Sequence, residues 1–409
     1  MARIVVTGYG ALSPLGLNAD ESWKGVVEGR SGVGPITLFD ISNFPVKYAA
    51  EVKNFDPKTV LDHKEVRRQD RFELLGFAAA TEAINHSGLD IKSGLNERVG
   101  VAVSSGAGGL GTMDEQFGTL HANGPRSISP FGIPRIMSNG AAGLISITHG
   151  LRGPCFSTAS ACASGADGIG MSMMLLRAGV VDVMIAGGTE APVTALAVGA
   201  FDRITAVSHR EDGAPSPFSA NRDGLIVGEG AAALVLETLE HAKERRASIY
   251  GEVIGYGASA DAFHITAPTE DGSGSARAIQ RALDDAHVTP AEIDYINAHG
   301  TGTTLNDEAE TRAIKLAFGQ RAYEVPVSST KSMTGHMMGA TGALEAVFCI
   351  RAICDGIVPP TINFVDKDEQ CDLDYVPNHS RQKPLKIAMS NSFGFGGHNS
   401  VLIFKRFEG

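Results

Sequence analysis

Short apolar runs alternate with longer amphipathic runs along the chain, and this order begins a second time near Ile249. The first round opens with a strand-like run, and its sequence Val6-Thr-Gly-Tyr-Gly-Ala is echoed by Val253-Ile-Gly-Tyr-Gly-Ala in the second. Strands that alternate with helices indicate an α/β fold, and a repeated order of elements indicates duplication. We therefore expect two related α/β halves, residues 1–248 and 249–409, packed sheet to sheet with helices outside. Because no linker rich in proline, serine or charge separates them, we expect one rigid body.

The composition limits the classes of partner. The 409 residues carry a net charge of −11, and only 6% of them are aromatic. Nucleic-acid surfaces are basic and commonly stack bases on aromatic rings, so we expect no nucleic-acid partner. No run approaches the roughly 18 apolar residues that span a bilayer, and the N-terminus lacks the apolar core of a signal peptide. We therefore expect no membrane span and a cytoplasmic location.

The five cysteines are scattered, and they form no C-x-x-C pair and no set with histidine at zinc-finger spacing. This usage is typical of a reducing compartment, and it predicts neither a disulfide framework nor a structural metal site.

One cysteine, Cys162, lies among Ala, Ser and Gly in the stretch Ser157 to Gly170, just before a run that predicts a helix. Small residues let a second backbone or an acyl group approach the sulfur, and the unpaired N–H groups of a helix N-terminus favour a thiolate. We therefore interpret Cys162 as a nucleophile. The alternative is a buried structural thiol, since free cysteine is among the most buried residue types.

Three polar stretches follow strand-like runs in the second half. They are Asn297-Ala-His299-Gly-Thr301-Gly-Thr303, Ser328-Ser-Thr-Lys331-Ser-Met-Thr-Gly-His336 and Asn391-Ser-Phe-Gly-Phe395-Gly-Gly-His398. Ligands of α/β folds bind beyond the carboxyl ends of strands, so we expect these stretches to converge on Cys162. Taken singly, each histidine could instead be a hydrogen-bonding residue of the core.

Two motifs point to other chemistry. Gly106 to Gly111 fits the dinucleotide pattern G-x-G-x-x-G, but no second strand with an acidic residue for a ribose follows it. Ser328-x-x-Lys331 fits the acylating-serine motif of β-lactamases, whose companion motifs Ser-Asp-Asn and Lys-Thr-Gly are missing. We therefore set aside a nicotinamide enzyme and a β-lactamase-like enzyme.

Taken together, the motifs resemble those of a known family. The β-ketoacyl-acyl carrier protein synthases, the elongating condensing enzymes of bacterial fatty-acid synthesis, carry a similar set in the same order. In this chain the set is Ser-Ala-Cys162-Ala-Ser-Gly, Asn-Ala-His299-Gly-Thr-Gly-Thr, Ser-Thr-Lys331-Ser-Met-Thr-Gly-His336 and Asn-Ser-Phe-Gly-Phe395-Gly-Gly. The resemblance runs from Arg3 to Lys405 and is closest to the type II synthases. It implies a thiolase-like fold, with duplicated α/β halves in five α-β-α-β-α layers, and a homodimer.

The resemblance also implies a reaction. Cys162 takes the acyl chain from acyl carrier protein as a thioester, and malonyl-acyl carrier protein then loses carbon dioxide to give the attacking enolate. His299 and His336 stabilise that enolate by donating from Nε2. Lys331, with Glu345 as its partner, supports the electrostatics and orientation of the histidines. No cofactor is implied, because the phosphopantetheine arrives on the carrier protein.

Other residues take supporting roles by the same resemblance. The backbone N–H groups of the nucleophile and of Phe395 form an oxyanion hole, and the Phe395 ring is a gate over the thiol. Thr301 and Thr303 hydrogen-bond the amides of the phosphopantetheine arm. Asp261 and His264 lie on a neighbouring mobile loop.

A basic cluster, Lys64-Glu-Val-Arg-Arg-Gln-Asp-Arg71, precedes an apolar helix in this acidic chain. By itself it indicates a solvated helix start with local ion pairs. Acyl carrier protein is strongly acidic, so the resemblance implies that Lys64, Arg67 and Arg68 form its docking patch.

Several alternatives stay open within the superfamily, namely a type I synthase and a polyketide ketosynthase. A thiolase is disfavoured because no cysteine follows Cys371, and an initiating synthase because it carries histidine and asparagine instead of two histidines. A non-catalytic scaffold subunit lacks the active cysteine.

One departure concerns specificity, because Gly132 follows Phe131 where relatives carry consecutive aromatic residues. If this stretch caps the acyl tunnel across a dimer interface, glycine deepens the tunnel for long or branched chains.

Overall fold

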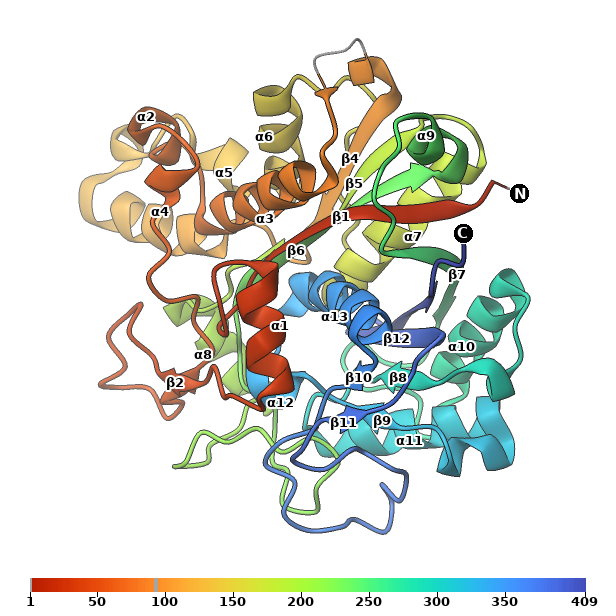
Figure 1. Cartoon of the computed structure of the whole chain (residues 1–409). Helices are drawn as coiled ribbons and strands as arrows, with labels where there is room; N and C mark the ends of the chain where they lie inside the picture. The colour runs from red at the N-terminus through yellow and green to blue at the C-terminus, as the bar shows by residue number, and fades with distance from the viewer. Residues whose placement is uncertain (1, 92–94) are drawn as a thin grey trace.

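Nine strands form one sheet across the centre of the computed structural model, which describes residues 2–91 and 95–409 (Figure 1). Across the sheet the strands are, in order, β4 (Val99–Ser104), β5 (Val183–Glu190), β6 (Gly230–Thr238), β1 (Ile4–Leu12), β7 (Gly251–Ala260), β13 (His398–Lys405), β12 (Ile387–Gly394), β8 (Tyr295–Asn297) and β9 (Val327–Ser328). Two small antiparallel pairs lie outside it, β2 (Gly34–Pro35) with β3 (Tyr48–Ala49) and β10 (Ile357–Val358) with β11 (Arg381–Gln382).

The two halves of the sheet share one pairing pattern. In the first half β4 and β5 are parallel, whereas β5 with β6 and β6 with β1 are antiparallel. In the second half β8 and β12 are parallel, whereas β12 with β13 and β13 with β7 are antiparallel. The halves meet where Ile4–Val6 of β1 pairs with residues 251–253 of β7. The predicted duplication is therefore confirmed, and the boundary at residue 248 stays a prediction.

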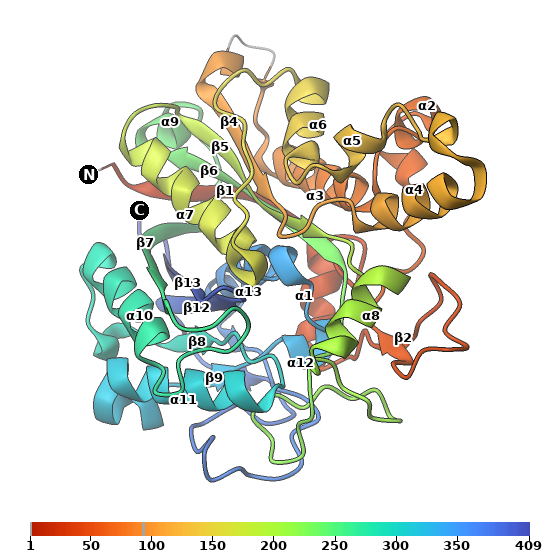
Figure 2. The same ribbon diagram turned by 180° about the vertical axis from the view of Figure 1, so that it is seen from behind.

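Helices form three layers around the two halves of the sheet (Figures 1 and 2). The outer layers are α3 (Arg71–Ser87) with α6 (Gly140–His149), and α10 (Ser273–Ala286) with α11 (Thr304–Phe318); the central layer is α7 (Ser164–Arg177) with α13 (Thr341–Asp355). The five-layer arrangement is thus confirmed, whereas the expectation of direct sheet-to-sheet packing is wrong. The physical reason is that α13 is buried all round over Thr341–Ile350, so it needs a sheet on either side.

Seven further α-helices complete the part of the chain that the structure describes. They are α1 (Ala19–Val27), α2 (His63–Val66), α4 (Leu110–Asn123), α5 (Gly132–Ile136), α8 (Ala195–Arg203), α9 (Leu239–Glu244) and α12 (Lys331–Thr334). Local signals explain several boundaries. The Asn18 side chain accepts a hydrogen bond from the Glu21 N–H and caps α1, and Gly88 ends α3 in the left-handed region at φ 62°.

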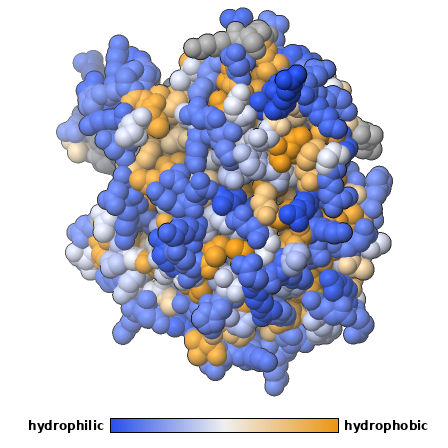
Figure 3. All heavy atoms as spheres, viewed as in Figure 1, coloured by the Kyte–Doolittle hydropathy of each residue, from blue (hydrophilic) through white to orange (hydrophobic). Residues whose placement is uncertain are grey.

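The surface differs in character from this buried centre. Hydrophilic residues dominate the face shown in Figure 3, where hydrophobic residues lie in small separate groups. Within residues 2–91 and 95–409, no helix combines the length and the apolar character that a bilayer crossing requires.

Candidate active site

The carboxyl ends of β8, β9 and β12 meet at one edge of the sheet, because β8 runs parallel to both of its neighbours. The three polar stretches follow these ends, so the fold gathers them. From the first half, the short helix η5 (Ala161–Ala163) packs against β12 and against η8 (Met338–Ala340). A cavity of about 330 Å³ opens here, and its walls include Cys162, His299 and His336.

Cys162 lies in η5, one turn before α7, with 7% of its surface exposed. The preceding residue, Ala161, has φ 51°, a left-handed conformation that alanine adopts only at a cost in energy. Two hydrogen bonds of the Ser164 hydroxyl hold this conformation. The hydroxyl donates to the Ala161 carbonyl at 2.6 Å and accepts from the Ser160 N–H at 3.0 Å. Gly394 ends β12 against this turn, where a Cβ would lie 2.7 Å from the Ser160 carbonyl oxygen. Small residues are therefore needed on both sides of the nucleophile.

The Cys162 thiol is protonated at rest. Burial raises its pKa to about 12, and the Lys331 charge and the backbone N–H of Phe395 oppose this rise without overcoming it. The backbone N–H groups near the sulfur favour the thiolate, but desolvation is the larger effect in the resting site. The thiol has to lose its proton during the reaction.

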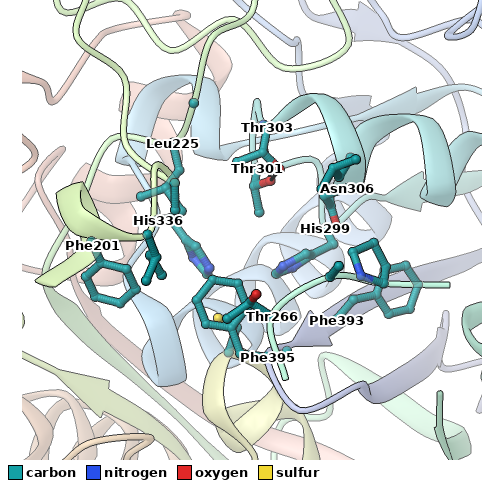
Figure 4. A pocket seen from close by; sticks show the side chains of 18 of the residues that line it. Phe201, Leu225, Thr266, His299, Thr301, Thr303, Asn306, His336, Phe393 and Phe395 are labelled. Carbon is teal, nitrogen blue, oxygen red and sulfur yellow. Dashed lines mark hydrogen bonds between the residues drawn. The ribbon is translucent and has the colours of Figure 1, made fainter. Parts of the chain in front are cut away.

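His299 and His336 face one another across the cavity, with ring centroids 5.2 Å apart and an angle of 84° between the rings (Figure 4). One ring nitrogen of each histidine and the Cys162 sulfur all lie within 4.8 Å of one another. Burial, followed by the Lys331 charge, lowers the pKa of both imidazoles well below the usual value, so both are neutral near pH 7. Neutral imidazole can both accept and donate a proton.

Separate contacts fix the two rings. The N–H groups of His299 and Gly300 donate to the Glu310 carboxylate at 2.8 and 2.7 Å, which holds the loop after β8. His336 Nδ1 lies 3.1 Å from the hydroxyl of Thr341. When that hydroxyl donates, the ring keeps its proton on Nε2.

Lys331 sits behind the histidines and not in the cavity wall. Its ammonium lies 2.6 Å from Glu345 Oε1, and both side chains are 1% exposed. Burial raises the pKa of Glu345 to about 7, and Lys331 opposes that rise. Lys331 therefore acts on the reacting groups through its charge and through space, and Glu345 compensates the charge locally.

Phe395 follows β12, and its ring lines the cavity 6.4 Å from that of Phe201 (Figure 4). Its backbone N–H and that of Cys162 both face the sulfur, since each stabilises the thiolate form. The two donors predicted for the oxyanion hole thus lie together.

The structure places the remaining cavity residues as follows. Thr301 and Thr303 line the wall, and their hydroxyls hydrogen-bond each other at 2.9 Å. Asp261 also lines it, and its carboxylate accepts from the Asn399 amide at 2.7 Å. His264 lies outside the wall, where its Nδ1 accepts from two backbone N–H groups at 3.1 Å. The loop that carries both residues contacts the loop after Phe395, because the Asp261 N–H donates to the Gly397 carbonyl.

The basic cluster lies apart from the cavity, on and after α2 beside α4 and α5 (Figures 1 and 2). Lys64 and Arg67 are exposed. Arg68 is less free, because it pairs with Glu65 at 2.7 Å and its guanidinium lies 5.2 Å from the Phe131 ring centroid. Arg71 turns inward to Glu229, so it cannot contribute to a surface patch.

Two buried carboxylates that sequence reasoning missed organise the site. One is Glu310, described above. The other is Glu190 at the end of β5, which accepts from the Ser105 hydroxyl and from the N–H groups of Gly106, Ala107 and Gly339. The N–H donors of the glycine-rich loop are thus directed to a carboxylate of the chain itself. The signal for Glu190 was an acidic residue ending an otherwise apolar strand.

This five-layered body, with a cysteine and two histidines in one cavity between its halves, has the architecture of the thiolase-like condensing enzymes. Two family models match the chain, the N-terminal domain of beta-ketoacyl synthase over residues 1–242 and its C-terminal domain over residues 250–365. The chain belongs to the beta-ketoacyl synthase family.

Individual proteins agree with this assignment. The 3-oxoacyl-[acyl-carrier-protein] synthase 2 of Coxiella burnetii is 48% identical over 407 residues, which cover 99% of this chain and 98% of that protein. The solved structure of the ishigamide ketosynthase/chain length factor matches with a TM-score of 0.94 and 37% identity over 100% of both chains. A type II PKS acyl-carrier protein in complex with its ketosynthase matches with a TM-score of 0.92 and 33% identity, also over 100% of both chains.

Proposed function

We propose that this chain is a 3-oxoacyl-acyl carrier protein synthase that lengthens acyl chains by two carbons. The observation that carries the proposal is that the Cys162 sulfur and one ring nitrogen each of His299 and His336 lie within 4.8 Å of one another in one cavity. Carbon–carbon bond formation from a thioester needs a nucleophile to hold the acyl group and donors to stabilise an enolate, and this set supplies both. The name of the Coxiella relative supports the substrate class.

The first step is acyl transfer. The Cys162 sulfur attacks the thioester carbonyl of acyl-acyl carrier protein, and the thiol proton passes to a neutral imidazole of the pair and from there to the departing phosphopantetheine thiolate. The N–H groups of Cys162 and Phe395 face the reacting atoms and stabilise the oxyanion of the tetrahedral intermediate. Because burial keeps the resting thiol protonated, the transfer depends on the imidazole.

The second step forms the carbon–carbon bond. Malonyl-acyl carrier protein loses carbon dioxide, and N–H groups of His299 and His336 stabilise the enolate oxygen that results. The enolate carbon attacks the carbonyl of the acyl-cysteine, the carbon–sulfur bond breaks, and the sulfur takes a proton again. No step consumes an oxidant or a reductant, and we propose that the reaction needs no cofactor beyond the phosphopantetheine of the carrier protein.

Replacing the nucleophile tests this assignment. We expect Cys162→Ala to abolish acyl transfer, while malonyl-acyl carrier protein still loses carbon dioxide because both histidines remain. Mass spectrometry of the intact chain after incubation with acyl-acyl carrier protein measures the first reaction, and release of labelled carbon dioxide measures the second. An acyl adduct on the Cys162→Ala chain would show that another residue is the nucleophile.

A polyketide ketosynthase is the second candidate, because solved ketosynthases of that kind share the whole fold. The identity of 33% to the type II PKS complex is lower than the 48% to the Coxiella synthase, which favours the fatty-acid reaction. Mass analysis of products separates the two. One condensation per cycle on a saturated acyl chain supports the first, and repeated condensation without reduction supports the second.

We propose acyl carrier protein as the partner, docked on Lys64, Arg67 and Arg68. A local positive patch on a chain of net charge −11 attracts an acidic partner and orients it. The solved complex of a related ketosynthase with its carrier protein supports this class of partner. We expect Arg67→Glu/Arg68→Glu to raise the KM for carrier-bound substrates, and more so at low salt, whereas a substrate on free pantetheine should react as before. Equal kinetics of the variant and the wild type at every ionic strength would show that this patch does not dock the carrier protein.

We also propose that the chain acts as a homodimer in the cytoplasm. Exposed apolar side chains on α4 and α5, including Phe117 at 57% and Ile133 at 71%, border a hollow of about 240 Å³ that contains Gly132. Covering such a surface with a second copy is the simplest way to remove it from water. All five cysteines are unpaired, as is usual in a reducing compartment. Light scattering of the wild type and of Ile133→Glu tests the dimer, which the variant should weaken.

A further inference from the structure

The same three side chains have the composition of a metal site. A thiolate and two imidazoles are a ligand set that zinc and similar cations prefer, and in catalytic zinc sites three protein ligands leave a fourth position open. Here the sulfur of Cys162 and one nitrogen each of His299 and His336 lie within 4.8 Å of one another. In a tetrahedral zinc site such atoms are about 3.3–3.7 Å apart, as bond lengths near 2.0–2.3 Å require. A contraction of about 1–1.5 Å would complete the geometry.

His336 has a nitrogen available to a cation. Among the described residues, His336 Nε2 is buried without a hydrogen-bond partner. It can bind a metal in the tautomer whose Nδ1–H donates to the Thr341 hydroxyl. The histidines are 1% and 3% exposed, so the site is also shielded from bulk water. An unpaired nitrogen in a buried site is costly, and a metal bond would satisfy it.

Supporting contacts resemble those of metal-binding histidines. Such histidines usually fix their second ring nitrogen with a hydrogen bond, and His336 Nδ1 has the Thr341 hydroxyl at 3.1 Å. Glu310 holds the backbone of His299. The Lys331 charge disfavours a cation nearby, but Glu345 pairs with it at 2.6 Å and reduces that repulsion.

We propose that Cys162, His299 and His336 form a binding site for a thiophilic divalent cation such as Zn²⁺, which occupies the cavity in competition with acylation of Cys162. A sulfur–metal bond forms, the sulfur–hydrogen bond breaks, and the proton goes to solvent, so one proton is released for each metal bound. The fourth position would be left to water. The metal site itself rests on the positions of three side chains, and only its competition with acylation rests on the reaction proposed above.

The metal and an acyl group compete for one sulfur, because the incoming cation has to displace the thiol proton of Cys162. Once Cys162 carries an acyl group the thiolate no longer exists, so the acyl-enzyme should not bind the metal.

Titration with Co²⁺ and Zn²⁺ tests the site. The chain is used without a purification tag and is kept reduced by a phosphine that does not compete for zinc. With Co²⁺ we expect the visible absorption of a tetrahedral ion and a near-ultraviolet thiolate-to-metal band, at one ion per chain and with one proton released. Zn²⁺ should displace Co²⁺ and abolish the spectrum. We expect Cys162→Ser and His336→Gln each to weaken zinc binding by about 100-fold or more, since even outer contacts of metal sites are worth 10- to 100-fold.

The matched control removes the exposed thiols. Cys155→Ser/Cys354→Ser deletes two exposed cysteines, and it should bind Co²⁺ with an unchanged spectrum. Should a substitution at Cys162 unfold the chain, acylation or carboxamidomethylation of Cys162 in the wild type serves instead, and either should abolish the spectrum.

Three outcomes would overturn the inference. They are no thiolate-to-metal band in the wild type, an unchanged band after Cys162 is blocked, and loss of the band in the Cys155→Ser/Cys354→Ser control. Acyl transfer by each preparation is measured separately without metal. The proposed reaction can therefore fail while the metal site stands, and the reverse also holds.

Discussion

Replacing Lys331 by methionine separates the electrostatic role of this residue from its structural role. The side chain is 1% exposed and its ammonium lies 2.6 Å from Glu345 Oε1, so the substitution leaves a buried carboxyl group without its partner. Breaking a buried ion pair in this way costs about 3–5 kcal/mol. With an unfolding entropy of about 2.1 cal/mol/K per residue, a chain of 409 residues should lose about 4–6 °C in Tm.

The same substitution should slow acyl transfer. The Lys331 charge lowers the pKa of Cys162, so its removal makes the thiol still harder to deprotonate. We expect the rate of acylation of Cys162 to fall at least about tenfold, which corresponds to about 1.4 kcal/mol of transition-state stabilisation. Quenched-flow sampling with mass spectrometry of the intact chain measures this rate in a single turnover.

A double variant separates the effect on stability from the effect on the rate of acylation. In Lys331→Met/Glu345→Met no buried charge remains unpaired, and apolar replacements of buried pairs are often neutral or stabilising, so Tm should recover. The acylation rate should stay low, because the positive charge is still missing. Recovery of both Tm and rate in the double variant would refute the electrostatic role and leave Lys331 as a structural residue. An unchanged Tm in the single variant would refute the estimated cost of breaking the Lys331–Glu345 ion pair.

Three further predictions follow from the structure. Burial opposes ionisation of Glu237, but hydrogen bonds from Arg245, His241 and Thr7 outweigh it and lower the pKa to about 2. Its stabilisation is therefore present above the ordinary value of 4.5 and is lost as the pH falls towards 2. Glu237→Gln should remove about 2 kcal/mol of this pH dependence in denaturant titrations between about pH 5 and 2.5, and an unchanged dependence would contradict the shift. Glu310→Gln should leave one of the two N–H groups before and after His299 Cα unsatisfied, at about 1–3 kcal/mol, and should lower kcat while KM stays near the wild-type value; a change in KM alone would argue against a positioning role. Gly132→Phe should shift turnover towards shorter acyl chains, and an identical chain-length profile would end the idea that glycine deepens the tunnel.

Much of the architecture could be predicted from the sequence, because it depends on local patterns. The repeated strand–helix order indicated the duplication, Asn18 and Gly88 marked helix ends, and polar residues after apolar runs marked the strand ends where β8, β9 and β12 gather the site. The central position of α13 was missed, since a helix buried all round has no amphipathic pattern to show which layer it occupies.

The protonation state of Cys162 was harder to predict than its position. The sequence placed Cys162 correctly before a helix, and from this we expected a stabilised thiolate. The structure shows that burial of the thiol outweighs the N–H donors that face it. The degree of burial depends on segments from both halves, such as those of Leu225 and Phe395, which line the same cavity. No local pattern around Cys162 contains that information.

Glycines explain why the reacting groups of the two halves can lie so close. A Cβ on Gly165 of α7 would lie 2.7 Å from the Gly339 carbonyl oxygen, and one on Gly188 of β5 would lie 2.6 Å from the same atom. Backbone therefore packs on backbone where η8 meets α7 and β5, and Glu190 stabilises this contact by accepting from the Gly339 N–H at 2.9 Å. The cysteine comes from one half and the histidines from the other, so their spacing is set by this contact. Any side chain larger than hydrogen at Gly165 or Gly339 has to separate the halves, and with them the nucleophile from the imidazoles that take its proton.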